Sequence, residues 1–106
     1  MKTLLTVATA LALSSPAFAA DELQGDPEAG KALAQTRSCV SCHGENGAST
    51  KPYFPNLAGQ NEVYLVKMLT DFREKKRIDP TMNAMAGKLS DQDIANLAAF
   101  FSNLKK

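Results

Sequence analysis

The stretch "RSCVSCHGENG", residues 37–47, contains both cysteines of the chain and its only histidine. Cys39, Cys42 and His43 fall within five consecutive positions. All the thiols and the only imidazole of the protein therefore lie in one short segment. What these three side chains bind determines how the rest of the sequence is interpreted.

Three of the four possible chemistries fit this segment poorly. A disulfide between cysteines three positions apart closes a very small loop, contributes little stability and leaves His43 without a role. A thioredoxin-like redox pair belongs at a helix start after a strand, and no strand is predicted before Cys39. Zinc takes four ligands, and the segment offers only Cys39, Cys42 and His43.

The fourth chemistry, covalent attachment of haem, accounts for every position. The pattern C-x-x-C-H is typical of haem c, in which each cysteine sulfur forms a thioether with one haem vinyl group. The adjacent histidine is then carried to the iron as an axial ligand. We therefore expect one haem c per chain, bound through Cys39 and Cys42, with His43 as an iron ligand.

The N-terminal segment 1–19 has the layout of a secretory signal peptide. Lys2 precedes an apolar run over residues 4–13, and small residues follow around "AFA" at 17–19. The run is shorter than the ~20 residues that a membrane-spanning helix needs. We expect cleavage after Ala19 and export to the periplasm, which leaves one small domain at residues 20–106.

Length and charge restrict the possible functions of this domain. A core of this size is marginal unless a disulfide, a metal or a large cofactor adds to it. The whole chain has 12 Lys+Arg and 11 Asp+Glu, and removal of Lys2 balances the two. Nucleic-acid binding needs a basic surface, so nucleic acid is not an expected partner.

The pattern of apolar residues and caps predicts an all-α fold with three main helices. No segment alternates long enough to be a strand. The expected helices cover 26–37, 61–77 and 90 onward, with Asp26, Asn61 and Ser90 as their N-caps. Residues 38–60 and 78–88 are rich in Gly, Pro, Asn and Ser and are expected to be irregular. Loops this long in so small a domain suggest that they surround a cofactor.

The natural candidate for a second axial ligand is methionine, because the sequence has no second histidine or third cysteine. Met1 leaves with the signal peptide, and Met68 falls on the apolar stripe of the second helix, where a core role is expected. Met82 and Met85 lie in the irregular segment 78–88. Composition alone does not separate these two.

Four segments together resemble class I cytochrome c, especially the small soluble bacterial monohaem cytochromes and one half of the dihaem periplasmic ones. They are "CVSCHG" (39–44), "FPNLAGQ" (54–60), "YLVKMLTDFR" (64–73) and "MNAMAGKLSDQDIANLAAFF" (82–101). The resemblance covers essentially all of residues 20–106. It implies a small cytochrome c fold wrapped around one covalently bound haem.

The resemblance also implies roles for particular residues. The distal methionine of the family commonly lies seven residues before the leucine of the last helix start, which is Met82 here, with Met85 as the alternative ligand or as packing. The carbonyl of Pro55, twelve residues after His43, would accept the imidazole N–H. Leu57 would pack on the haem. Further candidates for propionate or haem-edge contacts are Gln60, Tyr64, Arg73 and Arg77.

The function that the resemblance implies is one-electron transport in the periplasm, without enzymatic activity. The expected partners are redox proteins that donate and accept the electron, including membrane redox complexes to which a soluble carrier docks. The alternative is a haem enzyme or ligand-binding sensor with an open or displaceable sixth position. No second His, Tyr or acid/base pair is evident in segment 78–88 to assist such chemistry.

Overall fold

The computed structural model describes residues 23–106, and the predicted signal peptide lies outside these residues. Every regular element from residue 23 to residue 106 is a helix, with no strand, which confirms the predicted all-α class. None of the described helices is long and apolar enough to cross a membrane. The helices are α1 (Pro27–Thr36), α2 (Cys39–His43), α3 (Glu62–Arg73), α4 (Pro80–Ala86) and α5 (Asp91–Ser102).

The three longer helices begin at the predicted N-caps. Each cap side chain accepts a hydrogen bond from a backbone N–H of its helix: Asp26 from Glu28, Asn61 from Tyr64, and Ser90 from Asp93. At α5 the cap is reciprocal, because the Asp93 carboxylate also accepts from the Ser90 N–H at 3.0 Å. Caps of this kind each contribute about 1 kcal/mol to stability.

Two segments that were expected to be irregular contain short helices, so the prediction of three helices is incomplete. Helix α2 lies within 38–60, and α4 lies within 78–88. The start of α4 has the same chemistry as that of α1: Pro80 is the first helical residue, and the Asp79 side chain accepts from the Met82 N–H at 3.1 Å. Seven residues are too few to reveal a helical period in the sequence.

Helix α3 is shorter than predicted, ending at Arg73 rather than at residue 77. Lys75 has a φ of 60°, in the left-handed region, which stops the helix. The backbone N–H groups of Lys76 and Arg77 then both donate to the Asp71 carbonyl, at 2.8 and 3.2 Å. These bonds turn the chain sharply toward α4.

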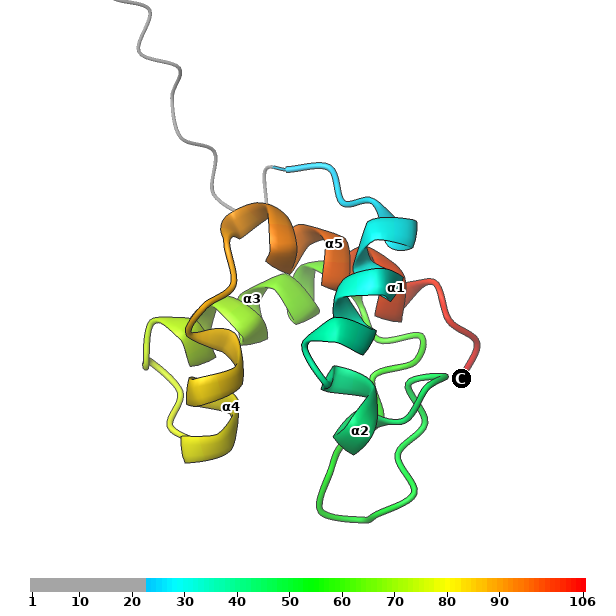
Figure 1. The fold of residues 1–106 in the computed structure, drawn as a ribbon, viewed down its shortest axis with the longest axis horizontal. Coiled ribbons are helices and arrows are strands. Elements are labelled where there is room, and N and C mark those ends of the chain that lie inside the picture. The colour runs from blue at the N-terminus through cyan, green and yellow to red at the C-terminus, as the bar shows by residue number, and fades with distance from the viewer. Residues whose placement is uncertain (1–22) are drawn as a thin grey trace, which may run out of the picture.

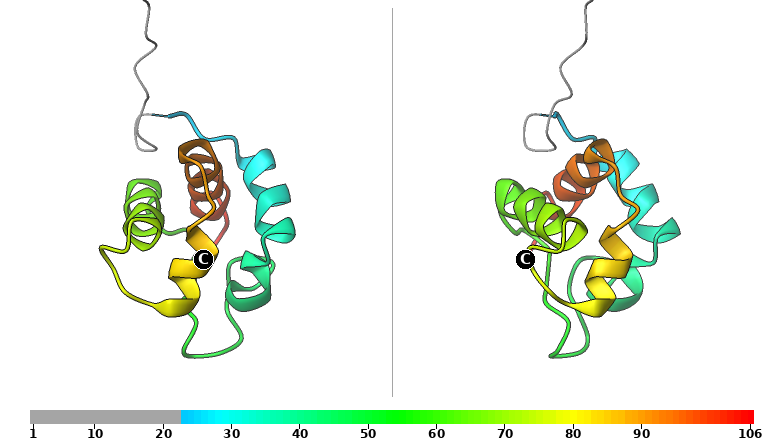
Figure 2. Two further views of the ribbon diagram at one scale, coloured as in Figure 1. Left: turned by 60° about the vertical axis from the view of Figure 1, so that its left-hand side comes forward. Right: turned by 90° about the vertical axis from the view of Figure 1, so that its left-hand side faces the viewer.

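The core is built on the close approach of α1 and α5 (Figure 2). A Cβ atom added at Gly30 would lie 2.0 Å from the Asn96 carbonyl oxygen and 2.8 Å from the Phe100 Cβ. Only glycine fits there. Glycine destabilises a helix by about 1 kcal/mol relative to alanine, but this close packing of the two helices requires it. Residue Ala34, one turn further along α1, is fully buried.

Helix α5 lies at the centre of the core, where its buried side chains pack against α1 and α3. The buried residues of α5 are Ile94, Ala95, Leu97, Ala98, Ala99, Phe100 and Phe101. Helix α3 packs on α5 as well, and α4 packs on α3. As a result α2 and α4 lie at the same end of the molecule, joined to the helical core by irregular segments (Figures 1 and 2).

Candidate functional site

Helix α2 presents the two cysteines and the histidine in one and a half turns. Cys39 and Cys42 are three positions apart, which places them on the same side of the helix. Both are free thiols and half-buried, and Cys39 packs against the main core. A single planar group with two reactive positions can therefore meet both sulfurs from one direction.

The thiol of Cys39 does not have the properties of a redox-active cysteine. Burial raises the pKa of Cys39 above its ordinary value, although a backbone hydrogen bond and the nearby Arg37 act in the opposite direction. Catalytic thiols in redox pairs have depressed pKa values, because the thiolate is the nucleophile. The environment of Cys39 thus disagrees with a thioredoxin-like redox pair.

His43 is buried, with 7% of its surface exposed, and its ring is fixed by a backbone carbonyl. The Nδ1 atom lies 2.8 Å from the Pro55 oxygen. A carbonyl oxygen only accepts, so Nδ1 carries the proton and donates it to this bond. The lone pair then resides on Nε2, which is the form of imidazole that binds a metal. The Phe54 ring lies beside it, with its centroid 6.4 Å from that of His43.

The segment that carries Pro55 is tied by backbone hydrogen bonds to Gly47, in the loop that follows α2. The Gly47 carbonyl accepts from the N–H groups of Leu57 at 2.8 Å and Ala58 at 3.0 Å. Gly47 has a φ of 70°, and a Cβ there would lie 2.7 Å from the Ala58 nitrogen, so this contact requires glycine. Leu57 is half-buried and packs against the core. Residues 44–58 thus hold the Pro55 carbonyl in position for His43.

The two candidate methionines both lie on α4. Met82 is in the first turn of the helix and is half-buried, whereas Met85 is more open, at 37% exposure. The sulfur of Met68, on α3, is instead 3.1 Å from Nη1 of Arg77. Of the methionine sulfurs in residues 23–106, that of Met82 is therefore the one that is partly buried and makes no hydrogen bond to another described residue.

Both arginines proposed as haem-edge contacts have other partners. The Arg73 guanidinium binds Asp91 at 2.8 Å, Glu74 at 2.9 Å and the Leu89 carbonyl at 3.1 Å. Burial by itself would lower the pKa of Arg73, but the hydrogen bonds to Asp91 and Glu74 raise it above its ordinary value. Arg73 therefore joins α3 to the start of α5 rather than pointing freely at a ligand.

The other residues predicted at the haem edge, Arg77, Gln60 and Tyr64, do not form one cluster. Arg77 lies over the Phe72 ring, with its guanidinium carbon 5.1 Å from the ring centroid. The Gln60 side chain accepts from the Asn61 N–H at 2.9 Å. Tyr64 remains 45% exposed. No contact in the described residues gathers these side chains around one point.

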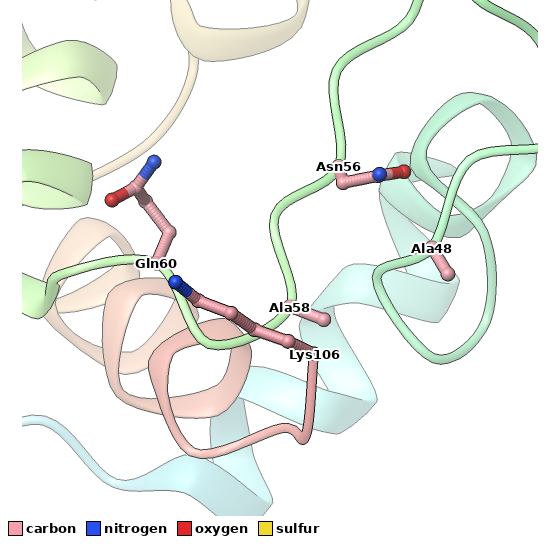
Figure 3. A pocket seen from close by; sticks show the side chains of 5 residues that line it. All are labelled: Ala48, Asn56, Ala58, Gln60 and Lys106. Carbon is pink, nitrogen blue, oxygen red and sulfur yellow. The ribbon is translucent and has the colours of Figure 1, made fainter.

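A pocket of about 270 Å³ is lined by neither the cysteines nor the histidine. Figure 3 shows its lining residues, which are Ala48, Asn56, Ala58, Gln60 and Lys106. None of the predicted iron ligands lines it. The predicted thioether cysteines and iron ligands lie on α2 and α4 instead.

The donor set of the site fits haem c. Two free thiols three positions apart, followed by an imidazole whose Nε2 is left free by the His43–Pro55 bond, are the groups that covalent attachment and axial ligation require. A thioether sulfur is available from α4 at the same end of the molecule. No additional ligand type is needed.

Comparisons with known proteins agree with this chemistry. A family model described as Cytochrome c matches residues 27–105. Cytochrome c4 of Pseudomonas aeruginosa is 42% identical over 104 residues, which cover 98% of this chain and 49% of that protein. Cytochrome c-554(548) of Halomonas halodenitrificans is 40% identical over 82 residues, 74% of this chain and 96% of that protein.

Comparison with a solved structure also gives a cytochrome c4 as a relative. Reduced recombinant cytochrome c4 from Pseudomonas stutzeri aligns with a TM-score of 0.71 at 41% identity, over 76% of this chain and 46% of that chain. The present chain therefore spans about half the length of the cytochromes c4 that it matches, and nearly all of cytochrome c-554(548).

Proposed function

This chain belongs to the cytochrome c family, with covalently attached haem c as its cofactor, and from this premise we propose that it is a periplasmic one-electron carrier. The predicted resemblance to class I cytochrome c is confirmed by these relatives. In the proposal, Cys39 and Cys42 form the thioethers and His43 and Met82 are the axial ligands. The observation that carries it is the 2.8 Å bond from His43 Nδ1 to the Pro55 carbonyl, which leaves Nε2 free for iron.

The residues of the chain divide the work of such a site. Cys39 and Cys42 hold the group on α2, and Pro55 fixes the orientation of the His43 ring and increases its basicity. Leu57 and the core side chains next to it exclude water from that side. When bound, haem supplies an iron that gains and loses one electron.

Met82 as the second ligand would favour electron transfer over ligand binding. A thioether favours the reduced iron and raises the reduction potential. If protein side chains occupy both axial positions, little rearrangement accompanies each electron transfer. Met82 is preferred to Met85 because it is more buried and because its position in the first turn of α4 is fixed by the Asp79 cap at 3.1 Å.

The remaining parts of the proposal concern the setting of the protein. The signal-peptide pattern of segment 1–19 supports export, with a mature domain at 20–106. In the proposal, the donor and the acceptor of the electron are redox proteins. The chain spans about half of the cytochromes c4 it matches, so its own donor and acceptor need not be those of the cytochromes c4. The alternative function, a haem enzyme or sensor, differs in having an open or displaceable sixth position.

A potentiometric titration of the purified protein, followed by absorbance, tests the carrier function. We expect one reversible wave with the slope of a one-electron couple, and the same two spectra after repeated cycles. Hydrogen peroxide added to the ferrous protein should be consumed only up to the amount that one electron per chain can reduce, which is one peroxide for every two chains. Catalytic peroxide turnover, or a spectrum that changes with each cycle, would favour the enzyme or sensor instead.

A further inference from the structure

The side chain of Asn83, next to the proposed ligand Met82, binds three backbone groups, one at the N-cap of its own helix and two before that helix. Its Nδ2 donates to the Phe72 carbonyl at 2.8 Å and to the Arg77 carbonyl at 2.9 Å. Its Oδ1 accepts from the Asp79 N–H at 2.9 Å. Both amide hydrogens and the amide oxygen are thus engaged, which is the main hydrogen-bonding capacity of an asparagine.

These three bonds join three successive segments of the chain. Phe72 is in the last turn of α3, Arg77 is in the turn that follows it, and Asp79 is the N-cap of α4. The turn itself is strained at Lys75, with its φ of 60°. One side chain therefore fixes the end of α3, the connecting turn and the start of α4 relative to one another.

Helix α4 depends on such polar anchoring because its other anchors are weak. A seven-residue helix is not stable alone. Ala86 is its only buried residue, and alanine buries little apolar surface. The Asp79 cap fixes the first turn internally, by accepting from the Met82 N–H at 3.1 Å, but does not attach the helix to α3. Asn83 supplies that attachment.

We propose that Asn83 is a positioning residue that sets the Met82 sulfur for the haem iron. The inference rests on the proposed function, in which Met82 is the axial ligand. Asn83 does not touch iron in this account, and it acts by fixing the backbone of the residue beside it. Loss of its two donated bonds leaves α4 free to shift relative to α3, and the methionine–iron bond is then opened more often.

The sharpest variant is Asn83→Asp, because the two side chains have nearly the same shape. Aspartate keeps an oxygen that accepts from the Asp79 N–H but loses both donations. Its second oxygen then faces the Phe72 and Arg77 carbonyls, which lie 2.8 and 2.9 Å from the present nitrogen. Asn83→Ala removes all three bonds without that repulsion and serves as the second variant.

A matched control is Asn103→Asp, at the C-cap of α5. The Asn103 Nδ2 donates to the Ala99 carbonyl at 2.7 Å, so the substitution makes the same chemical change and also removes a donated bond to a backbone carbonyl. It does so in α5 rather than α4. A general loss of stability would affect the control and the Asn83 variants alike.

The readouts are spectroscopic and structural, measured on holoproteins with haem attached. In both Asn83 variants we expect the long-wavelength iron–sulfur charge-transfer band of the ferric protein to weaken. Two lost hydrogen bonds should raise the rate of carbon monoxide binding to the ferrous protein about tenfold or more. Exchange of the Met82 and Asn83 amide hydrogens should speed up by a similar factor. Asn103→Asp should match the wild type in all three.

The outcomes separate this inference from the proposed function. Wild-type band intensity and carbon monoxide kinetics in both Asn83 variants, beside a Met82→Ala protein that binds carbon monoxide readily, would overturn the role of Asn83 and leave the proposed function standing. Equal changes in Asn103→Asp would also overturn it. A wild type that lacks the band and binds carbon monoxide as fast as Met82→Ala would overturn the proposed function and this inference together.

Discussion

Replacement of both Cys39 and Cys42 by alanine is expected to abolish the retention of haem by the denatured chain. In the proposed site the two sulfurs would hold the haem by covalent bonds, so denaturation would not release it. Without them, the proposed axial ligands His43 and Met82 would provide only coordinate bonds, which are lost when the chain unfolds. Mass spectrometry of the unfolded chain should show the added mass of one haem in the wild type and almost none in the double variant.

The single variants and a neighbouring substitution make this prediction specific. Cys39→Ala and Cys42→Ala should each keep one thioether and hence retain haem, with an absorption spectrum shifted by the remaining vinyl group. Ser41→Ala, an exposed position between them on α2, should retain haem as the wild type does. Full retention in the double variant would contradict attachment through these two sulfurs.

The second large effect is expected from Met82→Ala, compared with Met85→Ala. Removal of the thioether sulfur should convert the ferric protein from low to high spin and lower the reduction potential. Axial ligands span roughly 0.8 V across haem proteins, so a fall of about 100 mV or more is expected. Absorbance and a potentiometric titration measure both properties.

Met85→Ala is the matched control, since it removes the same side chain from the same helix at a more exposed position. We expect a low-spin ferric spectrum and a potential close to that of the wild type. If Met85→Ala produces the high-spin spectrum and Met82→Ala does not, the ligand assignment is reversed. If neither does, α4 does not supply the ligand.

The parts of the fold that could be predicted from sequence are those encoded locally. Helices α1, α3 and α5 have a polar N-cap followed by apolar residues at helical spacing, and their starts agree with the predictions. Helices α2 and α4 were missed because five and seven residues show no period. For α4 the signal was present in "DP" at 79–80, the same pair that begins α1.

The candidate site shows the same division. Cys39, Cys42 and His43 are adjacent in sequence, so their chemistry could be identified without a fold. The contact between His43 and Pro55, twelve residues apart, was expected only through the family resemblance, and it is present at 2.8 Å. The partners of Arg73 could not be predicted, because Asp91 and the Leu89 carbonyl are brought to it by the packing of α3 near the start of α5. Asn83 was missed for the same reason.

The most direct test of the central claim, that the iron is closed on both sides by the protein, is the absorption spectrum of the reduced wild-type protein before and after addition of carbon monoxide. If His43 and Met82 fill both axial positions, the reduced spectrum should be low-spin and should stay unchanged after carbon monoxide is added at neutral pH. Rapid conversion to the spectrum of a carbon monoxide complex would contradict the carrier account, because it would show an open or easily vacated sixth position.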